Sequence, residues 1–265
     1  MVSSREGRNI WEMSAVVEFE DVIAVTGSFP VLTGVDVSVN EGEIVLVRGE
    51  NGAGKTSFLR ACAGLLRVSA GSARVLGFDM RVDRRTPRRY IGFLGHENNL
   101  YRDLWAKEHV EFRAAAGRGS KSDAEAALAK GGFPSSLWSV PISALSAGQR
   151  RKIAIASVIV ARPRLWLLDE PFGALDAQTR MAVQSEFVGL WEQSAGSTVI
   201  LVTHDLEEAV LLADRVIVMT ARPGRIKSDT VVDLPRPRVI DELRFDDRFK
   251  ELEHQIWREL RDEII

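Results

Sequence analysis

Apolar runs of four or five residues alternate along the chain with longer stretches in which apolar residues recur at helical spacing. Short runs rich in β-branched residues predict strands, and the longer stretches predict helices. The predicted strands are residues 15–19, 35–39, 44–47, 90–94, 165–168, 198–202 and 215–219. The predicted helices are residues 55–63, 107–116, 123–129, 149–161, 178–193 and 206–212. Strand and helix in this rhythm predict an α/β fold with a mostly parallel sheet flanked by helices.

The spacing of these elements also predicts a domain organisation. A main domain over residues 15–233 contains a helical insert at about residues 97–160, and residues 1–14 form a flexible tail. Residues 234–265 form a linker followed by an amphipathic helix. Its apolar positions are Phe245, Phe249, Leu252, Ile256 and Leu260. We favour a helix that packs on its own domain over one that binds a partner.

Composition excludes several classes of protein. The 265 residues carry a formal net charge of −2, which gives no reason to expect nucleic-acid binding. Cys62 is the one cysteine, so an internal disulfide is impossible and a reducing compartment is expected. No apolar run approaches the roughly 18 residues of a membrane span, and the polar N-terminus lacks the apolar core of a signal peptide. Any membrane role is therefore expected to come through a partner.

A glycine-rich segment follows the predicted strand 44–47 and reads Gly-Glu-Asn-Gly-Ala-Gly-Lys-Thr. This is the P-loop pattern, whose glycines let backbone N–H groups point at phosphate oxygens. Lys55 supplies a cation, and Thr56 offers a hydroxyl to Mg²⁺. A chance match is the alternative, and the strand–loop–helix context argues against it. The expected nucleotide-binding residues are Gly49, Asn51, Gly52, Ala53, Gly54, Lys55, Thr56 and Ser57.

Two acidic residues, Asp169 and Glu170, stand at the exit of the apolar strand 165–168. At the carboxyl end of a buried parallel strand, Asp169 is placed beside the P-loop to hold Mg²⁺. Glu170 is then placed to orient and deprotonate an attacking water. The alternative is a strand that simply reaches the surface before Pro171, and the P-loop upstream makes it the weaker interpretation.

A third motif, Leu-Ser-Ala-Gly-Gln at residues 145–149, resembles the Leu-Ser-Gly-Gly-Gln signature of the ATP-binding-cassette (ABC) ATPases. The resemblance extends over nearly all of residues 15–232. Asp176, in Gly-Ala-Leu-Asp, resembles the family's D-loop aspartate, and His204 resembles its switch histidine. The resemblance adds to the site the nucleotide-binding residues Leu145, Ser146, Ala147, Gly148, Gln149 and Asp176, with His204 joining Glu170 as a catalytic residue.

The resemblance implies a P-loop NTPase with an ABC-type core, an N-terminal antiparallel β subdomain and a helical insert. It implies ATP and Mg²⁺ as ligands, and a second ABC ATPase subunit, identical or different, packed head to tail. The partner's signature would then close each ATP site, because the helix behind Ser146 aims its positive end outward. Transmembrane permease subunits are the other implied partners, with the chain on the cytoplasmic face of the cell membrane.

Three positions depart from the family's pattern. Ala147 replaces a glycine, which is harmless if its φ is negative. The loop after strand 90–94 lacks the usual glutamine, so His96 or Glu97 must take its place, and Glu97 is our candidate Mg²⁺ ligand. The aromatic residue expected to stack on adenine is absent near Thr26, and Phe29 is the nearest candidate.

The two parts of the chain resemble different branches of the family. Residues 16–170, with Asn-Gly-Ala-Gly-Lys-Thr and Leu-Ser-Ala-Gly-Gln, resemble ATPases of cytochrome c-type haem exporters. Residues 171–260, with Pro-Phe-Gly-Ala-Leu-Asp-Ala and Ala-Arg-Pro-Gly-Arg-Ile, resemble ATPases of nitrate, sulfonate and taurine importers. We favour an exporter-like partner, with the importer as the alternative. A soluble ABC ATPase of translation or DNA repair is a second alternative, which the single P-loop and the lack of a heptad pattern disfavour.

Overall fold

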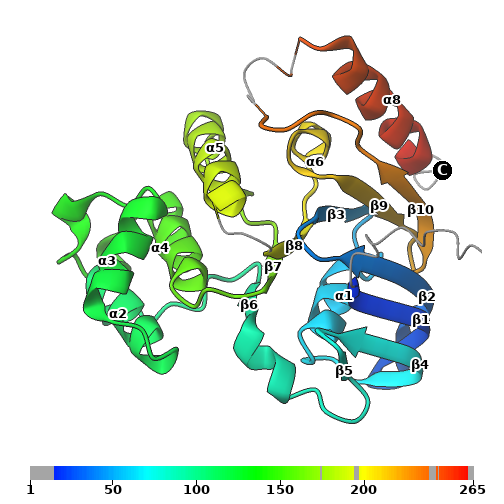
Figure 1. Cartoon of the computed structure of the whole chain (residues 1–265), viewed down its shortest axis with the longest axis horizontal. Helices are drawn as coiled ribbons and strands as arrows, with labels where there is room; N and C mark the ends of the chain where they lie inside the picture. The colour runs from blue at the N-terminus through cyan, green and yellow to red at the C-terminus, as the bar shows by residue number, and fades with distance from the viewer. Residues whose placement is uncertain (1–14, 174, 194–196, 239–242, 244, 262–265) are drawn as a thin grey trace, which may run out of the picture.

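A six-stranded sheet lies at the centre of the molecule (Figure 1). The computed structural model describes residues 15–173, 175–193, 197–238, 243 and 245–261. The sheet has the order β10-β9-β3-β8-β7-β6, and each neighbouring pair is parallel except β10 and β9. Its strands are β3 (Ile44–Gly49), β6 (Ile91–Leu94), β7 (Leu165–Asp169), β8 (Thr198–Val202), β9 (Arg215–Met219) and β10 (Ile226–Val231). The mostly parallel sheet predicted from the sequence is thus confirmed.

The central strands are apolar along their whole length because both faces of the sheet are covered. In β7, Trp166 and Leu168 belong to a core under α5 (Ala177–Gln193), α6 (Leu206–Leu212) and α8 (Asp247–Arg261). Leu165 and Leu167 belong to a second core, which includes residues of α1 (Lys55–Cys62). Because β3, β8 and β7 are parallel neighbours, their carboxyl ends lie together at one end of the sheet, where the functional residues lie.

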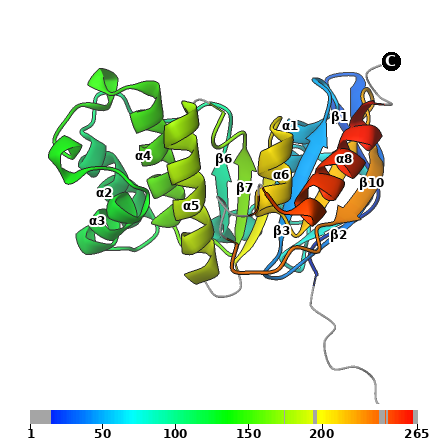
Figure 2. The ribbon, with the colours of Figure 1, turned by 90° about the horizontal axis from the view of Figure 1, so that it is seen from above.

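A four-stranded antiparallel sheet packs on the other side of α1 (Figures 1 and 2). Its order is β2 (Phe29–Asn40), β1 (Ala15–Thr26), β4 (Val68–Val75) and β5 (Phe78–Asp79). The predicted strands 15–19 and 35–39 are parts of β1 and β2, and the pattern missed β4, β5 and β10. These three strands are short of apolar residues because one face stays partly exposed.

A helical unit is set to one side of the central sheet (Figures 1 and 2). It consists of α2 (Ala106–Ala116), α3 (Lys121–Lys130) and α4 (Ala147–Ile159) around an apolar core of its own. Single turns of 3₁₀-helix lie at η1 (Thr86–Tyr90), η2 (Ser135–Leu137) and η3 (Ile142–Ala144). The expected helical insert therefore lies in the predicted region of the chain. Within the described residues, no helix is both long enough and apolar enough to span a bilayer.

The amphipathic C-terminal helix α8 packs against α6 and β9. Phe249, Leu252 and Ile256 are buried there, in the core that lies under α5 and α6. Phe245 was expected on the same apolar face, but it lies before the first turn of α8 and is exposed. The predicted tail over residues 1–14 lies outside the described residues.

Candidate ATP-binding and hydrolysis site

The loop between β3 and α1 is shaped by glycines that no other residue could replace without strain. Gly49 has φ +148 and Gly54 has φ +84, a region that favours glycine. A Cβ at Gly49 would lie 2.4 Å from the carbonyl oxygen of Met219, and one at Gly54 would lie 2.8 Å from that of Val31. The backbone therefore turns tightly into α1, whose first N–H groups lie at the floor of a cavity.

Lys55 is the first residue of α1 and is only 7% exposed. Its ammonium donates to the carbonyl oxygens of Gly49 at 2.7 Å and Glu50 at 2.8 Å. An ammonium has three N–H groups, so the third is available for a phosphate oxygen. Burial lowers the pKa of Lys55, and the negative charges of Glu170 and Asp169 oppose that shift. The loop thus holds a cation where phosphate would bind.

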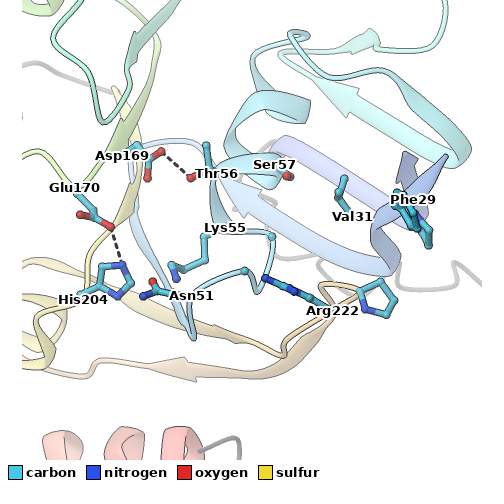
Figure 3. A pocket seen from close by; sticks show the side chains of 14 residues that line it. Phe29, Val31, Asn51, Lys55, Thr56, Ser57, Asp169, Glu170, His204 and Arg222 are labelled. Carbon is cyan, nitrogen blue, oxygen red and sulfur yellow. Dashed lines mark hydrogen bonds and ion pairs between the residues drawn. The ribbon is translucent and has the colours of Figure 1, made fainter. Parts of the chain in front are cut away.

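A hydroxyl and a carboxylate meet where α1 passes the end of β7. Thr56 Oγ1 donates to Asp169 Oδ2 at 2.8 Å (Figure 3). Hard oxygen atoms of this kind fit Mg²⁺, which commonly uses one or two carboxylates together with phosphate and water. Within the described residues, no group of three or more His, Cys, Asp or Glu side chains could hold a metal ion. The hydroxyl and carboxylate oxygens of Thr56 and Asp169 fit Mg²⁺ by their chemistry.

Glu170 points into the same cavity from the end of β7 (Figure 3). Its Oε1 atom lies 2.7 Å from Nε2 of His204, and its Oε2 atom lies 3.6 Å from Nδ1 of His96. Glu170 has φ +51, a left-handed conformation that is costly for a glutamate. The carboxylate of Glu170 thus lies near two imidazoles, and such a carboxylate is a suitable acceptor for a proton from water.

The position of His204 depends on contacts of the turn between β8 and α6. The carbonyl oxygen of His204 accepts a hydrogen bond from Arg48 Nη2 at 2.8 Å. The next residue, Asp205, caps α6 by accepting from the N–H of Glu208 at 3.2 Å. Burial raises the pKa of Glu208 to about 7, and Thr203 donates a hydrogen bond to its carboxyl group. The turn is therefore held on both sides of His204.

One open cavity of about 680 Å³ is lined by many of the predicted site residues, namely Asn51, Gly52, Gly54, Lys55, Thr56, Ser57, Asp169, Glu170 and His204 (Figure 3). Gly49 and Ala53 of the P-loop are not among the residues that line it. Phe29 lines the cavity and is 76% exposed, so its ring is free to stack on a bound base.

The cavity is also lined by four residues that were not predicted from the sequence, namely Pro30, Val31, Arg222 and Pro223. Arg222 lies in the turn between β9 and β10 and packs closely on the P-loop. A Cβ added at Gly52 would lie only 2.9 Å from its Nε atom. The pairing of β9 with β10 brings Arg222 and Pro223 to the P-loop, and spacing along the sequence does not encode that contact.

The structure separates the two candidates for the missing glutamine. His96 lies next to Glu170, whereas Glu97 lines another cavity, of about 300 Å³, together with His109 and Arg113. The candidate Mg²⁺ ligand Glu97 is therefore not among the residues that line the Thr56–Asp169 cavity.

The signature residues lie outside the cavity of their own chain. Ser146 caps α4, because its Oγ accepts from the N–H of Gln149 at 3.2 Å while Gln149 Oε1 accepts from the N–H of Ser146 at 2.9 Å. Ala147 lies in the first helical turn and not in the left-handed region, so its methyl group adds no strain. The residues of the signature and the D-loop that do not line the cavity are Leu145, Ser146, Ala147, Gly148, Gln149 and Asp176.

Comparisons with known proteins agree with this geometry. The family model described as ABC transporter matches residues 32–173. The chain is 41% identical to the aliphatic sulfonates import ATP-binding protein SsuB of Rhodopseudomonas palustris, over 80% of this chain and 73% of the relative. It is 35% identical to SsuB 2 of Pseudomonas savastanoi, over 89% of this chain and 82% of the relative.

Among solved structures, the chain resembles the dimeric ATP-binding cassette MJ0796 in a post-hydrolysis state bound to ADP and Pi. The TM-score is 0.74 at 26% identity, over 83% of this chain and 100% of that one. The chain thus combines similarity to ABC proteins with a P-loop, an acidic pair at the end of β7 and an ABC-type fold. The chain therefore belongs to the ABC transporter family, as an ATP-binding subunit that hydrolyses ATP.

Proposed function

We propose that the chain binds MgATP in the cavity in front of the P-loop and hydrolyses it with Glu170 as the general base. Lys55 and the N–H groups of the loop hold the β- and γ-phosphates. Thr56 and Asp169 hold Mg²⁺, which neutralises phosphate charge when bound. Glu170 accepts a proton from the attacking water, and His204 orients the Glu170 carboxylate. The carrying observation is the 2.7 Å contact between Glu170 and His204 in the cavity that also contains Lys55.

The base of ATP is proposed to stack on Phe29. The ring is exposed, and Arg222 and Pro223 line the same cavity. Figure 3 shows Phe29 and Arg222. Phe29→Ala is expected to weaken ATP binding about tenfold, because stacking of a base on an aromatic ring contributes about 1–3 kcal/mol. Titration with a fluorescent ATP analogue measures the dissociation constant.

Tyr90→Ala, at the exposed last residue of η1, is the matched control and should leave ATP affinity unchanged. A Phe29→Ala variant that binds ATP as tightly as the parent would remove Phe29 from the site. Phe29→Trp should bind ATP about as tightly as the parent, because the tryptophan ring also offers a face for stacking.

We propose that two cassettes close head to tail around two ATP molecules. Ser146 and its helix lie outside the cavity of their own chain, and the N-terminal end of α4 favours negative charge. A γ-phosphate bound by a second subunit is the proposed ligand of that end. The dimeric state of the similar MJ0796 cassette supports this arrangement. The proposed position is the cytoplasmic face of the cell membrane, against transmembrane permease subunits.

We propose that the transporter is an importer of organic anions of the sulfonate type. The main support is the 41% identity with SsuB of Rhodopseudomonas palustris over 80% of the chain, because SsuB is an aliphatic sulfonate import protein. The importer-like motifs of residues 171–260 agree with it. The haem-exporter interpretation, which we favoured from the sequence, has no support from the named relatives and becomes the alternative.

Deletion of the gene separates the two interpretations, because the two transporters would serve different needs of the cell. A strain without this chain is expected to grow normally on sulfate and to fail on an aliphatic sulfonate as its sulfur source. Its content of c-type cytochrome should stay at the parental level. Normal growth on the sulfonate, together with loss of c-type cytochrome, would instead support the exporter. Complementation with the intact gene is the control.

A further inference from the structure

Arg151 lies two residues after the signature, in α4, and is only 2% exposed. A guanidinium has five N–H groups. Each of the five finds an acceptor on another segment of the chain. The bonds run from Nε to Pro171 O (2.7 Å), from Nη1 to Gly95 O (3.0 Å) and Asn98 Oδ1 (2.8 Å), and from Nη2 to Asp169 O (3.0 Å) and Glu170 O (2.9 Å).

The acceptors of Arg151 are neutral carbonyl oxygens, four of the backbone and one of an amide side chain. Burial lowers the pKa of Arg151 to about 10, which leaves the guanidinium charged at neutral pH. Such a charge is costly to bury unless all its N–H groups are bonded. The bonds therefore fix the relative positions of the segments that supply the oxygens.

One of those segments carries the proposed base. The backbone of Glu170 is held on both sides, since its N–H donates to Val202 O at 2.9 Å and its carbonyl oxygen accepts from Arg151. Its φ of +51 is unfavourable and persists only where neighbouring contacts hold it. The Glu170 carboxylate faces His204 in this conformation. The carbonyl oxygen of Glu170 also accepts from the N–H of Gly173 at 3.2 Å, so loss of the bonds from Arg151 would remove part of what holds this φ.

The same guanidinium also reaches the loop after β6. It binds Gly95 and Asn98, which stand on either side of His96 in the sequence. Arg151 is five residues after Ser146, a rise of about 7.5 Å along the helix. One helix therefore connects the capped Ser146 to the backbone of Glu170 and to the loop that carries His96.

We propose that Arg151 is a positioning residue for ATP hydrolysis, which holds the Glu170 backbone and the loop at residues 95–98 in the arrangement required for proton abstraction. The inference rests on the proposed role of Glu170 as the base. Arg151 does not line the ATP cavity, so it acts through the residues to which it is bonded.

The test is Arg151→Lys in the full chain. An ammonium keeps the charge but has three N–H groups and no planar fork, so it cannot replace five bonds in fixed directions. We expect kcat for ATP to fall about 10²-fold, the effect of misplacing a reacting group by about 1 Å. The KM for ATP should change by less than about threefold, as for an interaction needed only in the transition state.

Arg238→Lys is the matched control for loss of a buried guanidinium. The side chain of Arg238 is 1% exposed and donates to carbonyl oxygens far from the ATP cavity. Those oxygens belong to Val210, Leu211, Ala213, Val232 and Leu234. Arg238→Lys should lower the melting temperature about as much as Arg151→Lys and leave kcat unchanged. If Arg151→Lys also keeps the parental kcat, the positioning role is wrong.

A second variant covers the case in which Arg151→Lys does not fold. Asn98→Ala removes a single acceptor from a loop, and we expect a fall in kcat of about fivefold at unchanged KM. A parental kcat for Asn98→Ala would overturn the proposal.

Glu170→Gln in the same assay keeps the two proposals apart. An inactive Glu170→Gln beside an active Arg151→Lys refutes the positioning role alone, whereas an active Glu170→Gln refutes the base.

Discussion

Replacing Glu170 with glutamine is expected to stop ATP turnover and to leave ATP binding intact. Glutamine has nearly the same shape as glutamate, but its amide cannot accept a proton from the attacking water. The binding residues Lys55, Thr56 and Asp169 are unchanged. General base catalysis contributes about 10²–10⁴-fold, so kcat should fall by that factor. Phosphate release measures turnover, and titration with an ATP analogue measures affinity.

The same variant tests the proposed dimer. If two copies close around ATP and hydrolysis opens them, Glu170→Gln should accumulate as a dimer in the presence of ATP. Size-exclusion chromatography with light scattering gives the mass of the complex. Glu41→Gln changes an exposed carboxylate paired with Arg164, away from the cavity, and is expected to behave as the parent. Turnover of Glu170→Gln at nearly the parental rate would show that another group is the base.

Replacing Lys55 with methionine is expected to weaken ATP binding about 10³-fold. A cation about 4 Å from a phosphate charge contributes about 4 kcal/mol where the effective dielectric constant is about 20. Methionine fills a similar space but carries no charge and no N–H group. The proposed role of Lys55 rests on its position, since Gly49 and Glu50 hold its ammonium at the loop. Isothermal titration calorimetry with ATP and Mg²⁺ gives the affinity.

Lys107→Met is the control for the loss of a lysine charge. Lys107 lies in α2, in an ion pair with Glu125, and does not line the ATP cavity. This variant should bind ATP as the parent does. Thermal unfolding of Lys55→Met should begin at a lower temperature than that of the parent, because the carbonyl oxygens of Gly49 and Glu50 lose the donor that Lys55 supplies. Binding of ATP by Lys55→Met within about threefold of the parent would contradict the proposed role of Lys55.

The central strands were predictable from sequence because both of their faces are buried. A run such as residues 165–168 is apolar throughout and stands out from its surroundings. The strands β4, β5 and β10 have one partly exposed face and mix polar residues with apolar ones. Their sequences carry little signal, and their pairing with distant strands decides the structure.

The phosphate-binding loop and the acidic pair could also be recognised from the chain alone. Their geometry depends on neighbours within a few residues: glycines that permit a tight turn, a strand before it and a helix after it. Asp169 and Glu170 follow a buried parallel strand, which ends at the same edge of the sheet as the P-loop strand. Local sequence therefore predicted a nucleotide site here, together with Lys55, Thr56, Asp169 and Glu170, which line its cavity.

Only the tertiary structure decided which more distant residues join that site. His96 rather than Glu97 lies next to Glu170, and Arg222 reaches the cavity from the turn after β9. Arg151, in α4, binds both the loop after β6 and the end of β7. These contacts depend on how strands and helices far apart in the chain are placed in space, and spacing along the sequence does not encode that placement. The sequence by itself determined the phosphate-binding chemistry, because that chemistry is local. The packing of separate elements decided what surrounds it.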